Sequence, residues 1–360
     1  MKRIIEKIGR KALSVLVAAA MGGLCSCEKI FEYEGDCDPH WQIQFVFERN
    51  LQFTDAFAAN VGSVRLDVFD AATGKLVLEQ RESGEALATG HYVMPVTLDP
   101  GRYYFMAWCG MEGNRHFTVP DAADTTERED LDCRLTALLT DSEGRSECHE
   151  RLDAVFYGCN FGPDSTGVQI TDEQGVHVVP IDLTKDTNEF DIVLQHTAGV
   201  LNPEKFDITI VEPNARLGWD NSVPAQEDSV VYRPYAVFNG AVDDENPMRS
   251  VEPNFLVAQL SCSRLMDTHN PQLTITNKET GKVVFRLPII KYIFLTDRHN
   301  NLRDAQNRLR KVTRQEYLDR EDHWSMQFFL DENLSADGGW LATSIIINDW
   351  HVIENPNVSL

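Results

Sequence analysis

The chain is dominated by short stretches in which apolar and polar residues alternate, and this period of two constrains the fold more than any other feature. WQIQFVFE (41–48) and SVRLDVFD (63–70) show the pattern near the start of the chain. Successive side chains of a β-strand point to opposite faces, so such stretches predict strands with a buried face. ATG (72–74) and DPG (99–101) supply turn residues between strands.

Similar stretches continue to the C-terminus, and few segments have the period of an amphipathic helix. EFDIVLQ (189–195), HWSMQFFL (323–330) and TSIIINDW (343–350) are strand-like, whereas RLTALLTD (134–141) and LRDAQNRLRK (302–311) fit a helix. Many short strands joined by loops predict an all-β fold of antiparallel β-sandwiches.

The length of the chain and a break in the strand pattern predict two domains. QHTAGVLNPE (195–204) interrupts the strands with a glycine and a proline. We therefore expect an N-terminal β-sandwich over residues 41–198 and a C-terminal β-sandwich over residues 199–360. LDVFDAATGKLVLEQ (66–80) aligns without a gap on LTITNKETGKVVFRL (273–287). This similarity indicates either a repeated domain or a common hairpin with a glycine in its turn.

The first 26 residues have the features of a secretory signal peptide. Residues 2–11 carry five basic side chains against one acid, and residues 12–24 form an uncharged apolar run. A basic head followed by a short apolar segment is typical of an exported protein, and the run is too short for a stable membrane-spanning helix.

The apolar run ends at Leu24-Cys25-Ser26-Cys27, which resembles the lipobox of bacterial lipoproteins. In that motif a small residue precedes the cysteine that is acylated and becomes the new N-terminus. Ser26 is small and precedes Cys27, whereas bulky Leu24 precedes Cys25, so we expect cleavage between Ser26 and Cys27. The lipid on Cys27 would hold the protein on a membrane without spanning it. Residues 27–40 are rich in acids and are predicted to form the tether of this lipid anchor.

Charge and cysteine content limit the partners and the covalent structure. The chain has a formal net charge of −23, which argues against binding nucleic acid. An exported protein can form disulfides, but sequence alone leaves their pairing open. The six cysteines concerned are Cys37, Cys109, Cys133, Cys148, Cys159 and Cys262.

The sequence contains no motif for catalysis, metal binding or a cofactor other than the covalent lipid. It lacks a G-x-S-x-G elbow, an H-E-x-x-H motif, a phosphate-binding glycine loop and a dinucleotide fingerprint. We therefore predict that the protein is not an enzyme and has no metal site. Its six tryptophans could form a glycan platform, but most lie in strand-like stretches and are more typical of core residues.

Several segments together resemble the minor fimbrium anchoring subunit family, the lipidated anchor subunits of Bacteroidales type V fimbriae. These segments are WQIQFVFERNLQFTDAFAANVGSVRLDVFDAATGKLV (41–77), YVMPVTLDPGRYYFMAWCG (92–110), QEYLDREDHWSMQFFLDEN (315–333) and SIIINDWHVI (344–353). The resemblance implies two tandem transthyretin-like β-sandwiches after a lipoprotein signal peptide. It also implies an outer-membrane protein, surface-exposed at the base of a fimbrium, that binds fimbrillin subunits of the stalk.

Type V fimbriae assemble by strand addition, in which a strand of one subunit completes the sheet of another. We expect the C-terminal segment or the sheet edge beside it to make this contact, through Ile345, Ile346, Ile347, Asn348 and Trp350. Alternatively, the segment only completes its own core. A surface glycan-binding lipoprotein and a fimbrial tip or accessory adhesin remain alternative functions.

Overall fold

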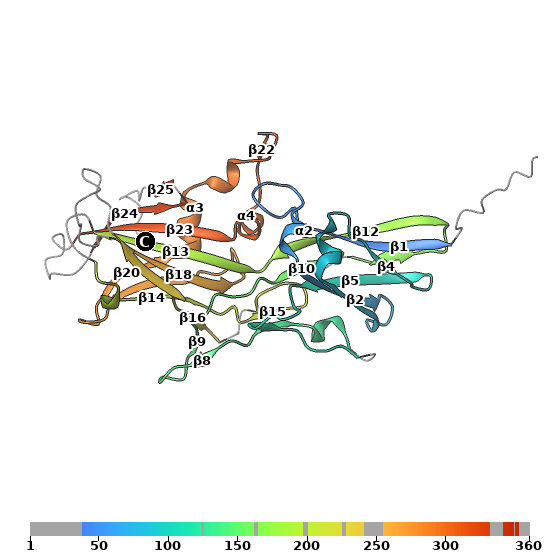
Figure 1. Cartoon of the computed structure of the whole chain (residues 1–360), viewed down its shortest axis with the longest axis horizontal. Coiled ribbons are helices and arrows are strands. Elements are labelled where there is room, and N and C mark those ends of the chain that lie inside the picture. The colour runs from blue at the N-terminus through green and yellow to red at the C-terminus, as the bar shows by residue number, and fades with distance from the viewer. Residues whose placement is uncertain are drawn as a thin grey trace, which may run out of the picture. The chain divides into compact units, whose positions relative to one another are not determined.

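The computed structural model describes residues 38–123, 126–161, 165–196, 201–224, 228–240, 255–331, 341–348 and 350–352 (Figure 1). The chain divides into two compact units. The larger unit comprises Trp41–Thr171 and Val178–Leu360, and the smaller comprises Met1–His40 and Asp172–His177. The predicted signal peptide and most of the tether lie outside the described residues. Among the residues that are described, none belongs to a helix with the length and apolar character needed to cross a membrane.

The first large sheet has eight strands in the order β3-β2-β5-β10-β12-β1-β4, with β11 paired to β5. Its strands are β1 (Pro39–Val46), β2 (Ser63–Asp70), β3 (Leu76–Ser83), β4 (Met94–Val96), β5 (Gly101–Cys109), β10 (Phe156–Cys159), β11 (Val168–Ile170) and β12 (Gly175–Lys185). Alternate residues of β2 enter two different cores, because Leu66 packs in one hydrophobic cluster and Phe69 in another. The central strands of this sheet are therefore covered on both faces.

A second sheet, shown around β13 in Figure 1, has the order β17-β18-β13-β23-β24-β25. Its strands are β13 (Thr187–His196), β17 (Ala236–Gly240), β18 (Phe255–Ser263), β23 (His323–Asp331), β24 (Leu341–Ile347) and β25 (Trp350–Val352). β13 pairs antiparallel with β18 but parallel with β23. A parallel neighbour requires a long connection, which the chain between β13 and β23 supplies.

A third sheet has the order β20-β19-β14-β16-β9-β8. Its strands are β8 (Leu139–Thr140), β9 (Ser146–Cys148), β14 (Phe206–Glu212), β16 (Val230–Tyr232), β19 (Gln272–Asn277) and β20 (Val283–Pro288). β16 and β9 are parallel, and the other described pairs of this sheet are antiparallel. The ring centroids of Phe285 on β20 and Phe328 on β23 lie 4.4 Å apart, so the second and third sheets pack face to face.

Two small sheets and a few short helices complete the described structure. The small sheets contain β6 (Phe117–Thr118), β7 (Cys133–Leu135) and β15 (Arg216–Leu217), and β21 (Leu302–Arg303) with β22 (Leu309–Arg310). The α-helices are α2 (Phe57–Asn60), α3 (Ile289–Leu295) and α4 (Arg314–Arg320), and the 3₁₀ helices are η2 (Gly84–Thr89), η3 (Arg128–Asp130), η4 (Pro203–Lys205) and η5 (Arg298–Asn300).

The predicted all-β fold is confirmed, but both helices expected from periodicity are wrong. β7 and β8 occupy the first predicted helix, residues 134–141, and the β21–β22 hairpin occupies the second, residues 302–311. In the hairpin, the Asp304 carboxylate accepts hydrogen bonds from the backbone N–H groups of Gln306 and Arg308. A side chain that bonds the backbone in this way stabilises a turn at the expense of a helix.

The two segments that align in sequence form hairpins with the same turn. In β2–β3 the Gly74 N–H donates to the Asp70 carbonyl, and in β19–β20 the Gly281 N–H donates to the Asn277 carbonyl, both over 2.8 Å. Gly74 has φ of 74° and Gly281 has φ of 68°, a conformation that favours glycine. Each hairpin also shifts register near its turn.

The sheets enclose large buried side chains whose polar atoms are satisfied. Trp108 and Trp324 are both fully buried. The Trp108 indole N–H donates to the Leu131 carbonyl over 3.1 Å, and the Trp324 N–H donates to Asn188 Oδ1 over 3.0 Å. These two tryptophans are core residues. Burying a side chain of this size stabilises the fold by about 3 kcal/mol or more.

The first sheet connects to the second through one residue, Asp186, which lies between β12 and β13. β7, β9 and β13 precede residue 198, yet each pairs with a strand that follows it, β15, β16 and β18 respectively. The division of the chain into two domains at residue 198 stays a prediction. A boundary at that residue would assign each of these strands and its hydrogen-bonded neighbour to different domains.

Candidate functional site: the C-terminal strands and the β12–β13 junction

The predicted partner segment occupies one side of the second sheet. β24 lies between β23 and β25, with Ile345 opposite Phe328 on one side and opposite Val352 on the other. Ile347 is 2% exposed and belongs to the core, whereas Ile345 and Ile346 are half-buried. In the described chain β24 therefore has a hydrogen-bonded neighbour on each side, and β25 with Trp350 is the outer strand.

Asn348 forms the turn between β24 and β25 and ties it to β23. Its φ is 44°, a left-handed conformation that asparagine tolerates better than most residues. Its N–H donates to the Ser325 carbonyl over 2.8 Å, and its Oδ1 accepts from the Ser325 N–H over 2.7 Å. Asn348 therefore holds the end of β24 and the turn that follows it to β23.

Asn348 also contacts a carboxyl group with a shifted pKa. Its Nδ2 donates to Glu321 Oε2 over 3.3 Å. Burial raises the pKa of Glu321 to about 7, although the nearby Arg298 guanidinium opposes this shift. The turn that places β25 is thus next to a group that titrates near neutral pH.

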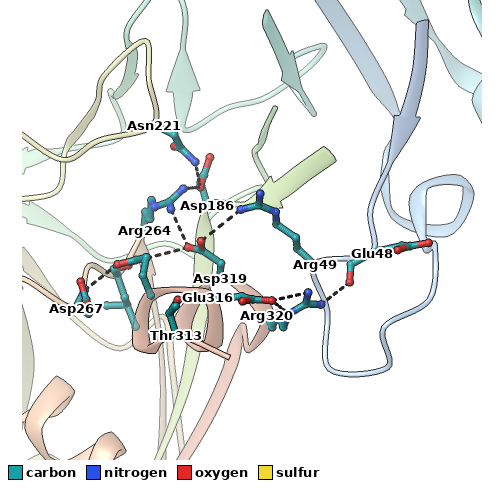
Figure 2. A network of polar contacts seen from close by, with 12 residues as sticks. Glu48, Arg49, Asp186, Asn221, Arg264, Asp267, Thr313, Glu316, Asp319 and Arg320 are labelled. Carbon is teal, nitrogen blue, oxygen red and sulfur yellow. Dashed lines mark hydrogen bonds and ion pairs between the residues drawn. The ribbon is translucent and has the colours of Figure 1, made fainter. Parts of the chain in front are cut away.

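A second group of polar residues gathers where β12 passes into β13, and Figure 2 shows its members converging on Asp186 and Asp319. The Arg264 guanidinium donates to Asp186 Oδ1 over 3.0 Å and to Asp319 Oδ1 over 2.8 Å. Asn221 Nδ2 donates to the same oxygen of Asp186 over 3.0 Å. We call Asp186, Asn221, Arg264 and Asp319 the junction network.

The junction network extends to the loop that follows β1. Arg49 Nη1 lies 3.8 Å from Asp319 Oδ2, and the adjacent Arg320 donates to the Glu48 carbonyl over 2.7 Å (Figure 2). The Arg320 guanidinium also lies 4.1 Å from the centre of the Phe53 ring. α4 is therefore held to the β1–α2 loop by charged and aromatic contacts.

Asp186 has an unusual electrostatic position within this network. It is fully buried, and burial raises its pKa to about 8 despite the opposing charge of Arg264. Its Oδ2 is buried without a hydrogen-bond partner among the described residues. Removing a carboxylate from water favours its neutral form, which explains the direction of the shift.

Three aromatic side chains converge on one cation in the larger unit. The Arg128 guanidinium lies 4.7 Å from the ring centre of Tyr104, 5.3 Å from that of Phe161 and 4.4 Å from that of Trp219. The three rings come from β5, from the chain after β10 and from the chain after β15. The Arg128 guanidinium lies between the three rings and covers the faces that they turn toward it.

The predicted partner residues lie next to one another in the structure. Ile347 of β24 pairs with Trp350 of β25, and the same two strands include or adjoin Ile345, Ile346 and Asn348. Ser26 and Cys27 lie outside the described residues, as does Cys37. The other five cysteines, from Cys109 to Cys262, are all free thiols. Sequence reasoning missed the junction network, because its residues come from four separate parts of the chain and share no local pattern.

Comparisons with known proteins agree with this geometry. The sequence model of a family described as fimbrillin-A associated anchor proteins Mfa1 and Mfa2 matches residues 33–356. The minor fimbrium anchoring subunit Mfa2 of Porphyromonas gingivalis is 20% identical over 287 residues, which cover 79% of this chain and 81% of that protein.

Two solved structures share the fold. The fimbrial anchor protein Mfa2 from Porphyromonas gingivalis has a TM-score of 0.63 at 16% identity, covering 89% of this chain and 100% of that one. A candidate polysaccharide-binding protein from Bacteroides thetaiotaomicron has a TM-score of 0.70 at 28% identity, with the same coverage of 89% and 100%.

Proposed function

Because this chain belongs to the family of fimbrillin-A associated anchor proteins Mfa1 and Mfa2, we propose that it anchors a type V fimbria to the cell surface. The observation that carries this proposal is the family match, which spans residues 33–356. In this role the protein is a lipoprotein of the outer membrane, exposed at the base of the fimbrium. It binds fimbrillin subunits of the stalk and helps to set the assembly or length of the fimbrium. The family consists of anchor proteins rather than enzymes.

The lipid is attached to Cys27. Small Ser26 before this cysteine and the apolar run before it support the assignment. Two or more acyl chains hold a protein durably, since each buried methylene contributes about 0.8 kcal/mol.

Metabolic labelling with palmitate tests the attachment. We expect Cys27→Ala to lose the label and Cys25→Ala to keep it. Label that persists in the Cys27→Ala protein would overturn this assignment.

The contact with the first fimbrillin subunit uses the outer side of the second sheet, at β25 or beside it. An outer strand offers unpaired backbone groups to an extended segment, and alternate side chains then select the partner. Among the described strands, β25 pairs with β24 alone, which supports this position.

A truncation after Asn348 tests this contact, because it removes β25 and leaves β24 and its turn. We expect the truncated protein to keep its melting temperature within a few degrees and to lose co-purification of fimbrial subunits from intact cells. A matched control is Cys25→Ala in the full-length protein, which changes only the predicted signal peptide. A folded truncated protein that still anchors fimbriae of normal length would place the contact elsewhere.

A surface adhesin that binds glycans is the second candidate function. The convergence of Tyr104, Phe161 and Trp219 favours it, because aromatic rings are the usual surfaces for sugars. Arg128 occupies the centre of these rings, so a sugar would have to displace it. Screening oligosaccharides against wild-type protein and Arg128→Ala tests this function, which predicts binding that increases in the variant.

A further inference from the structure

One segment of this acidic protein is strongly basic. Residues 282–314 contain nine Lys or Arg residues and two acids, a formal charge of +7 in a chain whose total is −23. The basic residues are Lys282, Arg286, Lys291, Arg298, Arg303, Arg308, Arg310, Lys311 and Arg314. We call residues 282–314 the basic segment.

The fold gathers much of the basic segment beside α3. The segment runs from the end of the third sheet through α3, η5 and the β21–β22 hairpin to the start of α4. The Val312 N–H donates to the His299 carbonyl over 3.2 Å. The Arg314 guanidinium lies 4.1 Å from the centre of the Phe294 ring. These contacts bring the chain that follows the hairpin back to η5 and α3.

A recess of about 480 Å³ lies at this place. Ile290, Phe294 and Leu295 of α3 give it an apolar surface, and Lys291 and Arg314 add two exposed cations. Leu295 is 49% exposed, so its side chain adds accessible apolar surface to the recess. Asp267 is the one acid that lines the recess in the described chain.

The two cations of the recess are not neutralised by neighbouring acids. Arg308 and Arg310 of the hairpin both pair with Asp304, at 2.7 Å and 3.1 Å. By contrast, no described residue forms an ion pair with Lys291, and Arg314 contacts an aromatic ring instead of a carboxylate. The recess therefore keeps a local excess of positive charge on a protein whose net charge is negative.

We propose that this recess binds an acidic peptide segment of a partner subunit, with an apolar side chain against Phe294 and Leu295 and carboxylates beside Lys291 and Arg314. The identity of the partner as a fimbrial subunit rests on the proposed function, whereas the chemistry of the ligand rests on the recess itself. Charge complementarity selects an acidic ligand. A stacked sugar is disfavoured because Arg314 already covers a face of Phe294.

Binding of a fluorescent peptide that alternates Glu and Leu tests the proposal with purified full-length protein. We expect Lys291→Glu and Arg314→Glu each to weaken binding about tenfold or more, and added salt to weaken binding to the wild type. Lys75→Glu is the matched control, because it makes the same charge change on an exposed lysine in the β2–β3 turn, and it should bind within about twofold of wild type. Unchanged binding by both reversed variants would overturn the proposal.

Two further measurements separate the alternatives. Lys291→Gln removes the charge without adding an acid, so it should also weaken peptide binding while keeping the melting temperature of the wild type. Vesicles containing anionic phospholipid serve as a second probe. If charge reversal reduces vesicle binding and leaves peptide binding unchanged, the recess is a membrane contact and the proposal is wrong. If a variant without peptide binding still anchors fimbriae of normal length, the partner assignment fails while the anchoring function stands.

Discussion

Asp186 shows how one buried residue can make the stability of this fold depend on pH. It is the single residue between β12 and β13, and it shares the Arg264 guanidinium with Asp319. Its pKa is raised from 3.8 to about 8, so the folded protein binds its proton more tightly than the unfolded chain does. A raised pKa contributes stability that is complete below pH 4 and is lost as pH rises toward 8.

We predict that Asp186→Asn reduces this pH dependence, because the amide resembles the neutral acid and cannot ionise. Each unit of pKa difference corresponds to about 1.4 kcal/mol. The variant should therefore gain several degrees of melting temperature relative to wild type between pH 5 and pH 9. Thermal melts across this range measure the effect, and Asp182→Asn on the exposed side of β12 is the control. Parallel curves for wild type and Asp186→Asn would contradict the prediction.

Gly110 and Gly113 share a left-handed backbone conformation but differ in the room available for a side chain. Comparing them separates the cost of backbone strain from the cost of a steric clash. Gly110 has φ of 78° and Gly113 has φ of 70°, so a Cβ strains both backbones similarly. A Cβ on Gly110 would lie 2.3 Å from the Ala154 carbonyl oxygen, whereas one on Gly113 would meet nothing within 4 Å.

We predict that Gly113→Ala costs only the strain of a left-handed backbone, about 1–2 kcal/mol. Gly110→Ala should cost about 1–3 kcal/mol more, because the loop and the backbone near Ala154 must separate. Denaturant unfolding of the two variants gives the difference directly. Equal losses would mean that the Ala154 backbone moves aside without cost.

At the scale of elements, β24 behaves as an inner strand of its sheet, although it comes close to the end of the chain. It pairs with β23 and β25, so each backbone N–H along its centre faces a neighbouring strand. Moving β24 to another subunit would break both ladders, while β25 could pair with a partner on its outer side.

We predict that Ile346→Pro lowers stability itself, because proline removes a donor and leaves a buried acceptor unpaired, a loss of about 1–3 kcal/mol. The truncation after Asn348 leaves the β23–β24 pairing intact and should lower the melting temperature less. Comparing the two variants by thermal unfolding tests the inner position of β24. A proline variant as stable as wild type would place β24 at an edge.

At the scale of the whole molecule, packing rather than covalent cross-links holds the described fold together. The five described cysteines are free, and four of them are buried. Burial raises the pKa values of the Cys109, Cys133 and Cys262 thiols, which disfavours the reactive thiolate.

We predict that a reducing agent leaves the melting temperature unchanged within about 2 °C, since a lost disulfide would cost about 2–5 kcal/mol. A thiol reagent should modify the native protein slowly at all buried cysteines and the unfolded protein quickly. Counting modified thiols by mass spectrometry in both states tests this. A large fall in melting temperature on reduction would show that disulfides form.

The sequence by itself determined the all-β class, the family and the turn of the repeated hairpin, because each depends on residues that are close in the chain. Alternating side chains predict strands wherever they occur, and the T-G-K turns at Gly74 and Gly281 need only a local backbone conformation. The family motifs are likewise contiguous, and the family match bears them out.

Tertiary structure alone decided the features that join distant segments. It placed short strands and turns in residues 134–141 and 302–311, because sheet pairing and the Asp304 turn outweighed a helical period. It assembled the junction network around Arg264 and gave Lys291 and Arg314 a shared recess, although the charge of residues 282–314 was already visible in the sequence. Contacts between residues far apart in the chain follow from packing in three dimensions, which a pattern within one segment does not encode.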